Sequence, residues 1–315
     1  MSAAAGSPDE QPPRFSGIRT FARQPHRTDA AGADVAVCGA PFDTGTSYRP
    51  GPRFGPEAIR SASALLRDYH PVHGIEVLSG LGVVDLGDLP VVPGNKERSL
   101  ELIAGALGEV IGAGALPLVL GGDHLVTLAE LRALAAAHGP LGLVLLDSHA
   151  DTWDSYYGER YFHGTPFRRA AEEGIVAPER SLMAGMRGPL YSAADLDDAR
   201  GLGFELIPWE ELRGIAAAEY GERARGRIGN GPAFLSFDID FVDPAFAPGT
   251  GTPEVGGPTA AEALAFVRAL TGIDFRGFDV VEVSPPYDNP GQTTALLAAN
   301  LAYEMLALAA LAASG

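Results

Sequence analysis

The sequence is short of cysteine and of positive charge, and both shortages exclude classes of protein. Its 315 residues include one cysteine, Cys38, so an internal disulfide is impossible and a reducing compartment is the simple expectation. Lysine and arginine total 23 against 40 acidic residues, which gives a net charge of −17. This balance argues against nucleic acid and anionic membrane surfaces as partners, and it permits a cationic substrate.

Long apolar runs and targeting signals are also missing. No uninterrupted apolar run reaches the roughly 18–20 residues that spanning a membrane needs, and the N-terminal residues lack the apolar core of a signal peptide. We therefore expect a cytoplasmic protein with no membrane partner. Residues 1–32 are rich in Pro, Gly, Arg and Ser, which predicts a flexible N-terminal arm, and residues 33–315 are expected to form a single domain.

What the sequence does contain is a regular alternation of two patterns. Eight short apolar runs, most of them bounded by Gly, Pro or Asp, are typical of parallel strands buried on both faces. These runs are 34–40, 82–88, 117–123, 141–147, 181–186, 204–208, 233–240 and 277–285. Helical patterns lie between them, at 55–67, 98–114, 124–138, 164–173, 192–201, 209–226, 259–271 and 292–313. The alternation predicts an α/β fold, a three-layer α/β/α sandwich around a mainly parallel sheet of about eight strands.

Charged and titratable side chains stand where two of these runs stop. Asp147, His149 and Asp151 follow one run at every second position, and Asp238 and Asp240 end another. Side chains two apart on an extended chain point the same way, so each set can converge on one point. In open α/β sheets, chemistry gathers beyond the carboxyl ends of the strands, which is where both sets are expected to lie.

The charge of these two motifs predicts bound metal. Four carboxylates near the end of an apolar sheet repel one another, and leaving them unpaired costs several kcal/mol each. No lysine or arginine lies within either motif, whereas two divalent cations would balance the four charges. His149 and His124, which ends a Gly-Gly-Asp-His run, complete an oxygen-rich ligand set without sulfur, and this favours Mn²⁺ over tetrahedral zinc. The sequence therefore predicts two Mn²⁺ ions, about 3.5–4 Å apart, that activate water for hydrolysis.

Together these motifs resemble the signature blocks of the ureohydrolase family, the arginase and agmatinase group. The blocks are "GGDH" (121–124), "DSHAD" (147–151) and "SFDIDFVDPAFAPGTGTPEVGG" (236–257), and the segments 45–60, 163–170 and 281–288 look like the agmatinase branch. The resemblance implies an arginase-like catalytic domain, a binuclear manganese site, hydrolysis of a guanidino group to urea and an amine, and assembly into trimers or hexamers. The metal ligands that it implies are His124, Asp147, His149, Asp151, Asp238 and Asp240, the same six that spacing and charge predict.

The resemblance also implies three catalytic residues. Asp151 would both bind metal and pass the proton of the attacking water to the leaving nitrogen. Glu282 resembles the family's guanidinium-binding glutamate, and a carboxylate that accepts two parallel N–H bonds suits this planar cation. His163 opens the segment "HGTPFRRA" and resembles the family's proton-shuttle histidine. Asp123 is expected to orient a metal ligand without binding metal itself.

The tail of the substrate is expected to contact the loop at residues 151–163. Its aromatic residues, Trp153 among them, suit an alkyl chain that ends in ammonium, and Asp154 could pair with that ammonium. Both features favour agmatine, hydrolysed to urea and putrescine. Arg160 or Arg49 could instead meet a carboxylate, which would indicate a guanidino acid: 4-guanidinobutyrate, 3-guanidinopropionate or a substrate of the proclavaminate amidinohydrolase type.

Other interpretations stay open from the sequence. A formimino-glutamate hydrolase would use the same metal chemistry on a related group, and an amide-hydrolysing relative would release acetate in place of urea. A metal-binding scaffold without activity is a rival of a different class, and it would hold metal without releasing urea.

Overall fold

The computed structural model describes residues 13–192 and 194–314, and a large parallel sheet lies at its centre. The eight strands are all parallel to their neighbours, in the order β4-β1-β5-β10-β9-β6-β7-β8. They are β1 (Val35–Gly39), β4 (Val83–Asp88), β5 (Leu116–Leu120), β6 (Gly142–Leu146), β7 (Leu182–Ala184), β8 (Glu205–Ile207), β9 (Ala233–Asp238) and β10 (Phe275–Val281). Each overlaps one of the eight predicted runs, so the predicted α/β fold is confirmed.

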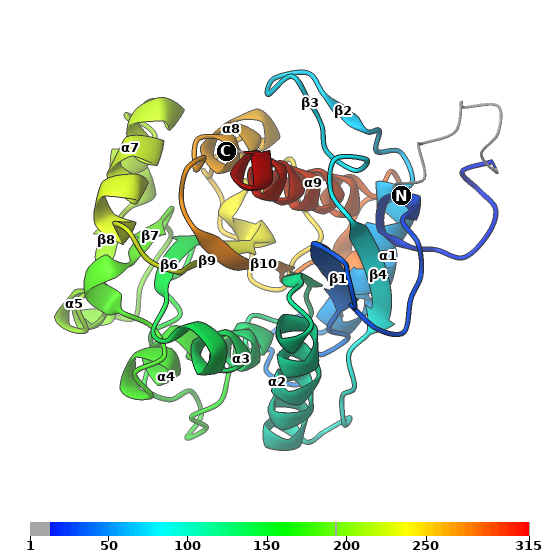
Figure 1. Ribbon diagram of the computed structural model, residues 1–315. Helices are drawn as coiled ribbons and strands as arrows, with labels where there is room; N and C mark the ends of the chain where they lie inside the picture. Colours follow the sequence, from blue (N-terminus) through cyan, green and yellow to red (C-terminus); the bar gives the residue numbers. More distant parts are fainter. Residues whose placement is uncertain (1–12, 193, 315) are drawn as a thin grey trace.

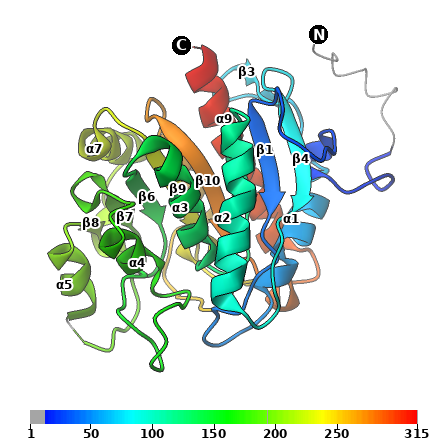
Figure 2. The ribbon, with the colours of Figure 1, turned by 60° about the horizontal axis from the view of Figure 1, so that its bottom comes forward.

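Helices cover both faces of the sheet and complete the three layers (Figure 1). One face carries α1 (Gly55–Ser63), α7 (Ala217–Ile228), α8 (Ala260–Arg268) and α9 (Thr293–Ser314). The other carries α2 (Lys96–Gly112), α3 (Val126–His138), α4 (Pro166–Glu172) and α5 (Ala194–Gly201). Figure 2 shows α2 and α3 in front of the strands, with α1 behind them.

Two details differ from the predicted elements. The helix expected over 209–226 is two helices, α6 (Trp209–Leu212) and α7, because the chain between them contains Gly214, a poor helix former. A small antiparallel hairpin, β2 (Tyr69–His70) with β3 (Ile75–Glu76), follows α1 and is absent from the sequence-based prediction.

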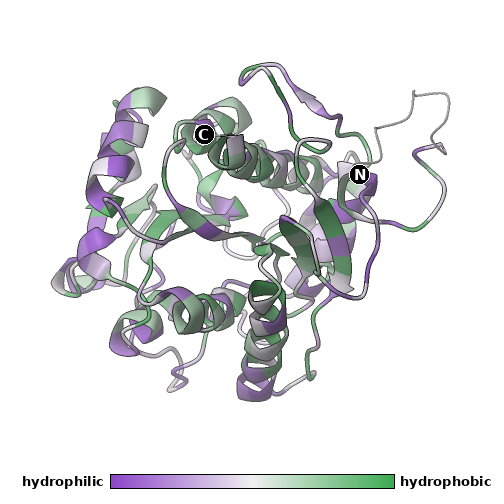
Figure 3. Ribbon diagram, viewed as in Figure 1, coloured by the Kyte–Doolittle hydropathy of each residue, from purple (hydrophilic) through white to green (hydrophobic). Residues whose placement is uncertain are grey.

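Alternate residues of the strands supply two separate cores. In β1, Val35 and Val37 pack in the core below α1 and α9, whereas Ala36 and Cys38 pack in the core below α2 and α3. Because both faces of the sheet are covered, its strands need apolar residues at nearly every position. Figure 3 shows this as strands in hydrophobic colours at the centre, with more hydrophilic residues on outer elements such as α7.

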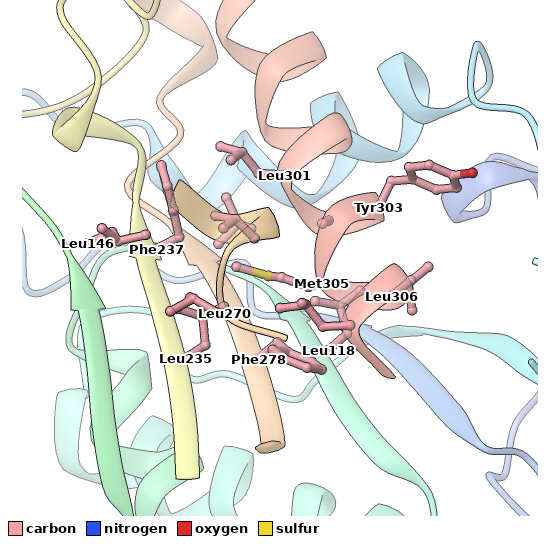
Figure 4. Packing of buried hydrophobic residues seen from close by; sticks show 14 of the residues in the cluster. Leu118, Leu146, Leu235, Phe237, Leu270, Phe278, Leu301, Tyr303, Met305 and Leu306 are labelled. Atoms are coloured by element: carbon pink, nitrogen blue, oxygen red, sulfur yellow. The ribbon is translucent and has the colours of Figure 1, made fainter. Parts of the chain in front are cut away.

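The C-terminal helix α9 forms much of one core. Figure 4 shows Leu301, Met305 and Leu306 of α9 gathered with Phe237 and Phe278 from the sheet. By length and mean hydropathy, 1.7 over an 18-residue window, α9 could cross a membrane. The expectation that no apolar run is long enough to span a membrane therefore overlooked α9, whose apolar residues are interrupted by Asn300 and Glu304. However, 72% of that window is buried inside the protein, which is the behaviour of a core helix.

The N-terminal segment docks on the domain earlier than predicted. Phe21 is buried and its N–H donates to Asp85 Oδ2 in β4 at 2.7 Å, while the N–H of Ala22 donates to Ser63 Oγ in α1 at 2.7 Å. The predicted flexible arm reaches residue 32, so the structure differs from it from Thr20 onward, because these contacts fix the chain. Residues 1–12 of that arm lie outside the described residues.

The strand order gathers the predicted site. The last two strands in the chain, β9 and β10, lie between β5 and β6. The carboxyl ends of four adjacent strands therefore meet along the middle of one sheet edge. In order across the sheet, the chain that leaves these strands carries His124, Glu282, Asp238 and Asp147.

Candidate metal centre

The buried imidazole of His124 faces three carboxylates. Its Nδ1 lies 2.9 Å from Asp151 Oδ2 and 3.2 Å from both Asp147 Oδ2 and Asp238 Oδ2. Neither His124 Nδ1 nor Asp147 Oδ2 has a hydrogen-bond partner among the described residues, although both atoms are buried. Unpaired buried polar atoms cost free energy, so this set of donors fits a bound cation.

A second set of ligands shares Asp147 with the first. His149 Nδ1 lies 3.1 Å from Asp240 Oδ2 and 3.6 Å from Asp147 Oδ1. His124, Asp147 and Asp151 form one set, and Asp147, His149 and Asp240 form the other, each with ligand atoms within 4.8 Å of one another. Because one carboxylate belongs to both sets, two cations held there would be neighbours. With Asp238, the structure brings together all six predicted ligands.

Short turns fix the acidic pairs in place. The N–H of His149 donates to Asp147 Oδ1 at 2.6 Å, and the N–H of Asp240 donates to Asp238 Oδ1 at 2.8 Å. Each aspartate thus binds the backbone two residues on, and keeps its other oxygen for the site. Asp151, further along the same chain, has a positive φ of 49°. Such a conformation costs a residue with a side chain strain of order 1–3 kcal/mol, and residues strained in this way are concentrated at functional sites.

Burial and mutual repulsion control the charges of the cluster. Burial raises the pKa of Asp238 well above its ordinary value, and the charges of Asp240 and Asp147 raise it further. Burial, with the charge of Asp147, also raises the pKa of Asp151 to about 6. Burial disfavours the charged form of His124, yet its three carboxylate neighbours hold the pKa of that imidazole well above the usual range. All three shifts indicate a site that draws positive charge.

His163 lies beside the cluster, between Glu282 and Ser47. Its Nδ1 is 3.0 Å from Glu282 Oε1, and its Nε2 is 2.7 Å from Ser47 Oγ. Burial opposes the charged form, but the Glu282 carboxylate raises the pKa of His163 to about 9. The imidazole is therefore protonated at neutral pH and can donate a proton. Ser47 is absent from the predicted residues, although it lies in the segment 45–60 that resembles the agmatinase branch.

Glu282 is buried, and one of its two carboxylate oxygens already has hydrogen-bond partners. Its Oε1 accepts from the N–H of His124 at 2.9 Å and contacts His163, while Oε2 has no hydrogen-bond partner within the described parts of the chain. A Cβ added at Gly251 would lie 3.3 Å from that Oε2, so Gly251 leaves the oxygen uncovered. The predicted pair of parallel N–H bonds to a guanidinium would need both oxygens, and only one is available.

Asp123, predicted to orient a metal ligand, has a different role in the structure. Its Oδ2 accepts from the N–H of Gly45 at 2.6 Å, and its Oδ1 accepts from the N–H of Leu125 at 3.0 Å. The carbonyl of Gly45 in turn accepts from the N–H of His163 at 3.0 Å. Asp123 therefore holds the loop that positions His163.

A cavity of about 590 Å³ opens onto the cluster. Four residues of the site line it: His149, Asp151, Asp238 and His163. The aromatic residues of its lining are Tyr48, Trp153, Tyr156, Tyr157 and Tyr191. Trp153 stacks on Tyr156, with ring centroids 5.1 Å apart, and Tyr156 Oη lies 3.1 Å from Tyr191 Oη. The wall is therefore a connected aromatic surface, suited to an alkyl chain.

Two residues predicted to bind the substrate's tail are not part of this lining. Asp154 Oδ1 lies 2.7 Å from Arg169 Nη2, and Arg160 Nη2 lies 2.8 Å from Glu172 Oε2. Each charge is thus already paired with a residue of α4. The predicted contacts of Asp154 and Arg160 with the tail do not fit this arrangement, because spacing within a loop does not reveal which side chains turn outward.

Sequence reasoning missed a further cavity wall, which is formed by Met186, Arg187, Pro189, Leu190, Tyr191, Asp195 and Leu196. Arg187 is its central residue and donates to the carbonyls of Asp240, Phe241 and Glu254 at 2.8, 2.9 and 2.7 Å. It therefore supports the chain that bears a predicted metal ligand. The only sequence feature that could have indicated this wall is its position directly after the apolar run 181–186, where functional residues of a parallel sheet are expected.

A parallel α/β sheet with two adjoining carboxylate–imidazole ligand sets at its strand ends has the architecture of a binuclear metal hydrolase. Residues 33–307 match the model of the arginase family, and the chain belongs to that family.

Three similar proteins indicate which branch of the family the chain belongs to. Guanidinopropionase of Pseudomonas aeruginosa is 48% identical over 299 residues, which cover 95% of this chain and 93% of the relative. Mitochondrial agmatinase of Gallus gallus is 41% identical over 318 residues, which cover 97% and 93%. The solved structure of proclavaminate amidino hydrolase from Streptomyces clavuligerus aligns with a TM-score of 0.91 at 42% identity, covering 96% of this chain and 100% of that one. The chain is a ureohydrolase of the agmatinase and guanidino-acid hydrolase branch, and it acts on the C–N bond of a linear guanidino compound.

Proposed function

We propose that the chain is a binuclear manganese hydrolase that releases urea from a small guanidino acid such as 3-guanidinopropionate or 4-guanidinobutyrate. The observation that carries this choice is the 48% identity to guanidinopropionase, against 41% to agmatinase, each over more than nine-tenths of this chain. It favours the guanidino-acid alternative over agmatine, the substrate preferred from the sequence alone.

The ligand sets support manganese as the metal. Four carboxylates and two imidazoles form an oxygen-rich environment without sulfur, which suits Mn²⁺. Two such cations supply the Lewis acidity that makes a water molecule nucleophilic near neutral pH. The shared carboxylate of Asp147 supports a paired arrangement over two separate sites.

The neighbouring side chains can move the protons that hydrolysis requires. Asp151, whose pKa burial raises to about 6, is ionised at neutral pH and can accept the proton of the attacking water. His163, whose pKa is about 9 beside Glu282, can donate a proton to the departing amine. The free Oε2 of Glu282 can accept one N–H of the guanidinium and so orient its carbon toward the site.

Arg49 is our candidate for the carboxylate of the substrate. Its guanidinium carbon lies 5.6 Å from the ring centroid of Tyr48 and 5.1 Å from that of Tyr287. Arg49 is not itself part of the cavity lining, but Tyr48 is, so the cation lies against an aromatic ring next to the cavity. Unlike Asp154 and Arg160, it is paired with these rings and not with an opposite charge among the described residues. Arg187, although it lines the cavity, has its donors engaged by backbone carbonyls.

An amine-tailed substrate such as agmatine is the second candidate. Asp195 and Glu254 line the same cavity, and either carboxylate could pair with an ammonium group. This charge pattern is the observation that favours agmatine.

The test is urea release by the Mn²⁺-loaded enzyme from a panel of guanidines. The panel contains 3-guanidinopropionate, 4-guanidinobutyrate, agmatine, arginine and formimino-glutamate. We expect the highest kcat/KM for one of the two guanidino acids. Preference for agmatine would contradict the proposed substrate class and leave the metal chemistry intact, and two bound metals without any urea would indicate a scaffold.

A matched pair of variants locates the tail. Arg49→Gln should raise KM for the preferred guanidino acid at least about tenfold with little change in kcat, because the lost contact lies far from the reacting carbon. Glu254→Gln removes a negative charge from the same cavity and should leave that KM unchanged or lower it. The opposite pattern, with KM raised by Glu254→Gln alone, would support the amine-tailed substrate.

A further inference from the structure

A fully buried polar path leads from the metal-facing histidine into the core of the protein. His124 turns Nδ1 toward the carboxylates, and its Nε2 lies 2.9 Å from Ser236 Oγ in β9. Ser236 Oγ donates to Asp279 Oδ1 in β10 at 2.7 Å. All three side chains are buried, so water does not compete for these bonds. None of the motifs that point to the site includes Asp279.

In each hydrogen bond around Asp279, the donor and the acceptor can be assigned. Its Oδ2 accepts from Thr127 Oγ1 at 2.6 Å, and its Oδ1 accepts from Ser236 Oγ and, at 3.3 Å, from the N–H of Phe237. A hydroxyl has one hydrogen, and that of Ser236 is used on the carboxylate. Ser236 Oγ can then only accept from His124, which places the imidazole hydrogen on Nε2. In the neutral imidazole, which is the form that binds a cation, the lone pair is therefore on Nδ1 and faces the predicted metal site.

A second buried acid, Glu130, lies near Asp279, so the two carboxyl groups affect each other's charge. Glu130 is completely buried in α3, and neither of its carboxyl oxygens meets a hydrogen-bond donor in the described chain. Burial raises the pKa of Glu130 well above its ordinary value, and the neighbouring negative charge of Asp279 raises it further. Burial also raises the pKa of Asp279, but the donors Thr127, Ser236 and Phe237 favour its charged form. Because Asp279 has these three donors and Glu130 has none among the described residues, the negative charge of the two acids is better placed on Asp279.

We propose that Asp279 is a positioning residue for metal binding: through Ser236 it holds the His124 imidazole in the tautomer and orientation that present Nδ1 to the cation. The negative charge at the end of this path also makes His124 a stronger electron donor. Carboxylates that support a metal-bound histidine commonly change metal affinity by about 10–100-fold. This inference rests on the proposed function, because it takes His124 as a metal ligand.

The experiment measures metal binding directly, so it does not depend on turnover. The full-length protein is stripped with a chelator and titrated with Mn²⁺ by calorimetry. In Asp279→Asn we expect one of the two Mn²⁺ affinities to fall by about 10–100-fold, because the isosteric amide keeps the shape of the path and removes its charge. The other affinity should change less, because His124 belongs to only one of the two ligand sets.

Two further variants separate this role from a general effect on folding. Ser236→Ala breaks the path at its middle and should weaken the same Mn²⁺ site, and the double variant Ser236→Ala/Asp279→Asn should be no weaker than the more affected single variant. Glu130→Gln is the matched control, because it makes a similar acid-to-amide change beside Asp279 without removing any of the hydrogen bonds in the path. This control should bind Mn²⁺ as the unmodified protein does. Thermal melts of the metal-free variants report whether each one is folded.

The outcomes are distinct. Mn²⁺ affinities within twofold of the unmodified protein for both Asp279→Asn and Ser236→Ala would overturn the inference, as would fully additive losses in the double variant. If Asp279→Asn does not fold, Ser236→Ala decides the question by itself. An unmodified protein that binds no Mn²⁺ would overturn the proposed function together with this inference, whereas normal binding that ignores both substitutions overturns only the inference.

Discussion

At the scale of single residues, the predicted metal centre depends most on Asp147. Its carboxylate is fully buried and belongs to both ligand sets, whereas Asp240 belongs to one. The N–H of His149 holds Asp147 Oδ1, so the orientation of this side chain is fixed by the backbone. Loss of Asp147 would therefore affect both cations, and loss of Asp240 would affect one.

Asp147→Ala should lower the manganese content below that of Asp240→Ala and abolish urea release. The physical reason is that one substitution removes a ligand from each set, while the other removes a ligand from a single set. Elemental analysis after gel filtration measures the bound metal, and a urea assay measures turnover. An Asp147→Ala protein with two metals and normal turnover would show that the ligand assignment is wrong.

His163→Asn should retain both metals and lose about 10²–10⁴-fold in kcat, the range of a positioned acid or base. In the unmodified enzyme, the pKa of about 9 means that the proton on His163 is present below that pH and is lost as the pH rises through it. The rate should accordingly fall above about pH 9, and the variant should lack this alkaline limb. An unchanged kcat would remove His163 from proton transfer.

At the scale of elements, a buried ion network holds the β2–β3 hairpin to α9. Glu304 of α9 contacts His70 Nε2 at 2.8 Å with one oxygen and accepts from Arg268 Nε at 2.8 Å with the other. Tyr303 Oη donates to the carbonyl of Asp68 at 2.8 Å, just before the hairpin. His70, His73 and Glu304 also have the spacing of a metal site, but Arg268 already balances the charge of Glu304.

Glu304→Ala should destabilise the fold by about 3 kcal/mol, because it leaves a buried histidine and an arginine without their acid. Glu210→Ala is the control. It removes an exposed pair with Arg213 and should cost no more than about 1 kcal/mol. The shift of the guanidinium unfolding midpoint reports both effects. Equal shifts would show that the network adds nothing beyond a surface ion pair.

At the scale of the whole molecule, the cluster of buried carboxylates couples stability to metal and to pH. Burial raises the pKa of Asp151 to about 6, above the ordinary 3.8 of the unfolded chain, so the metal-free fold prefers the protonated acid. Protonated Asp151 therefore contributes its full stabilisation below pH 3.8, the pKa in the unfolded chain, and this contribution is lost as the pH rises through about 6. His124 and His149, whose pKa values the carboxylates raise, add stability in the same direction.

The metal-free protein should therefore melt several degrees higher at pH 5.5 than at pH 8. With Mn²⁺ bound, the cations replace the protons, so the melting temperature should be higher and should depend less on pH. Differential scanning calorimetry of both forms in matched buffers makes the comparison. A metal-free Tm that is flat over this range would contradict the charge balance inferred for the site.

Assembly into a trimer or hexamer and a cytoplasmic location stay predictions at this scale. Light scattering of the purified protein measures the first of them.

Much of the architecture follows from local sequence patterns. Continuous apolar runs indicate strands covered on both sides. The spacing of Asp147, His149 and Asp151 predicted that they converge, but they do so through a turn at Asp147 and a positive φ at Asp151, where an extended chain was expected. The charge of these motifs, with no basic residue among them, was enough to predict the cations. These inferences depend on spacing and on charge, both of which are written in the sequence.

Only the tertiary structure decided which distant segments meet. The position of β9 and β10 between β5 and β6 brings Asp279 and Ser236 behind His124, and sequence spacing does not specify strand order. The loop residue Asp154 turns to Arg169, away from the cavity, because a nearby cation outcompetes a distant ligand for its charge. Local geometry and charge are thus determined by the sequence itself, whereas side-chain partners across the fold depend on packing.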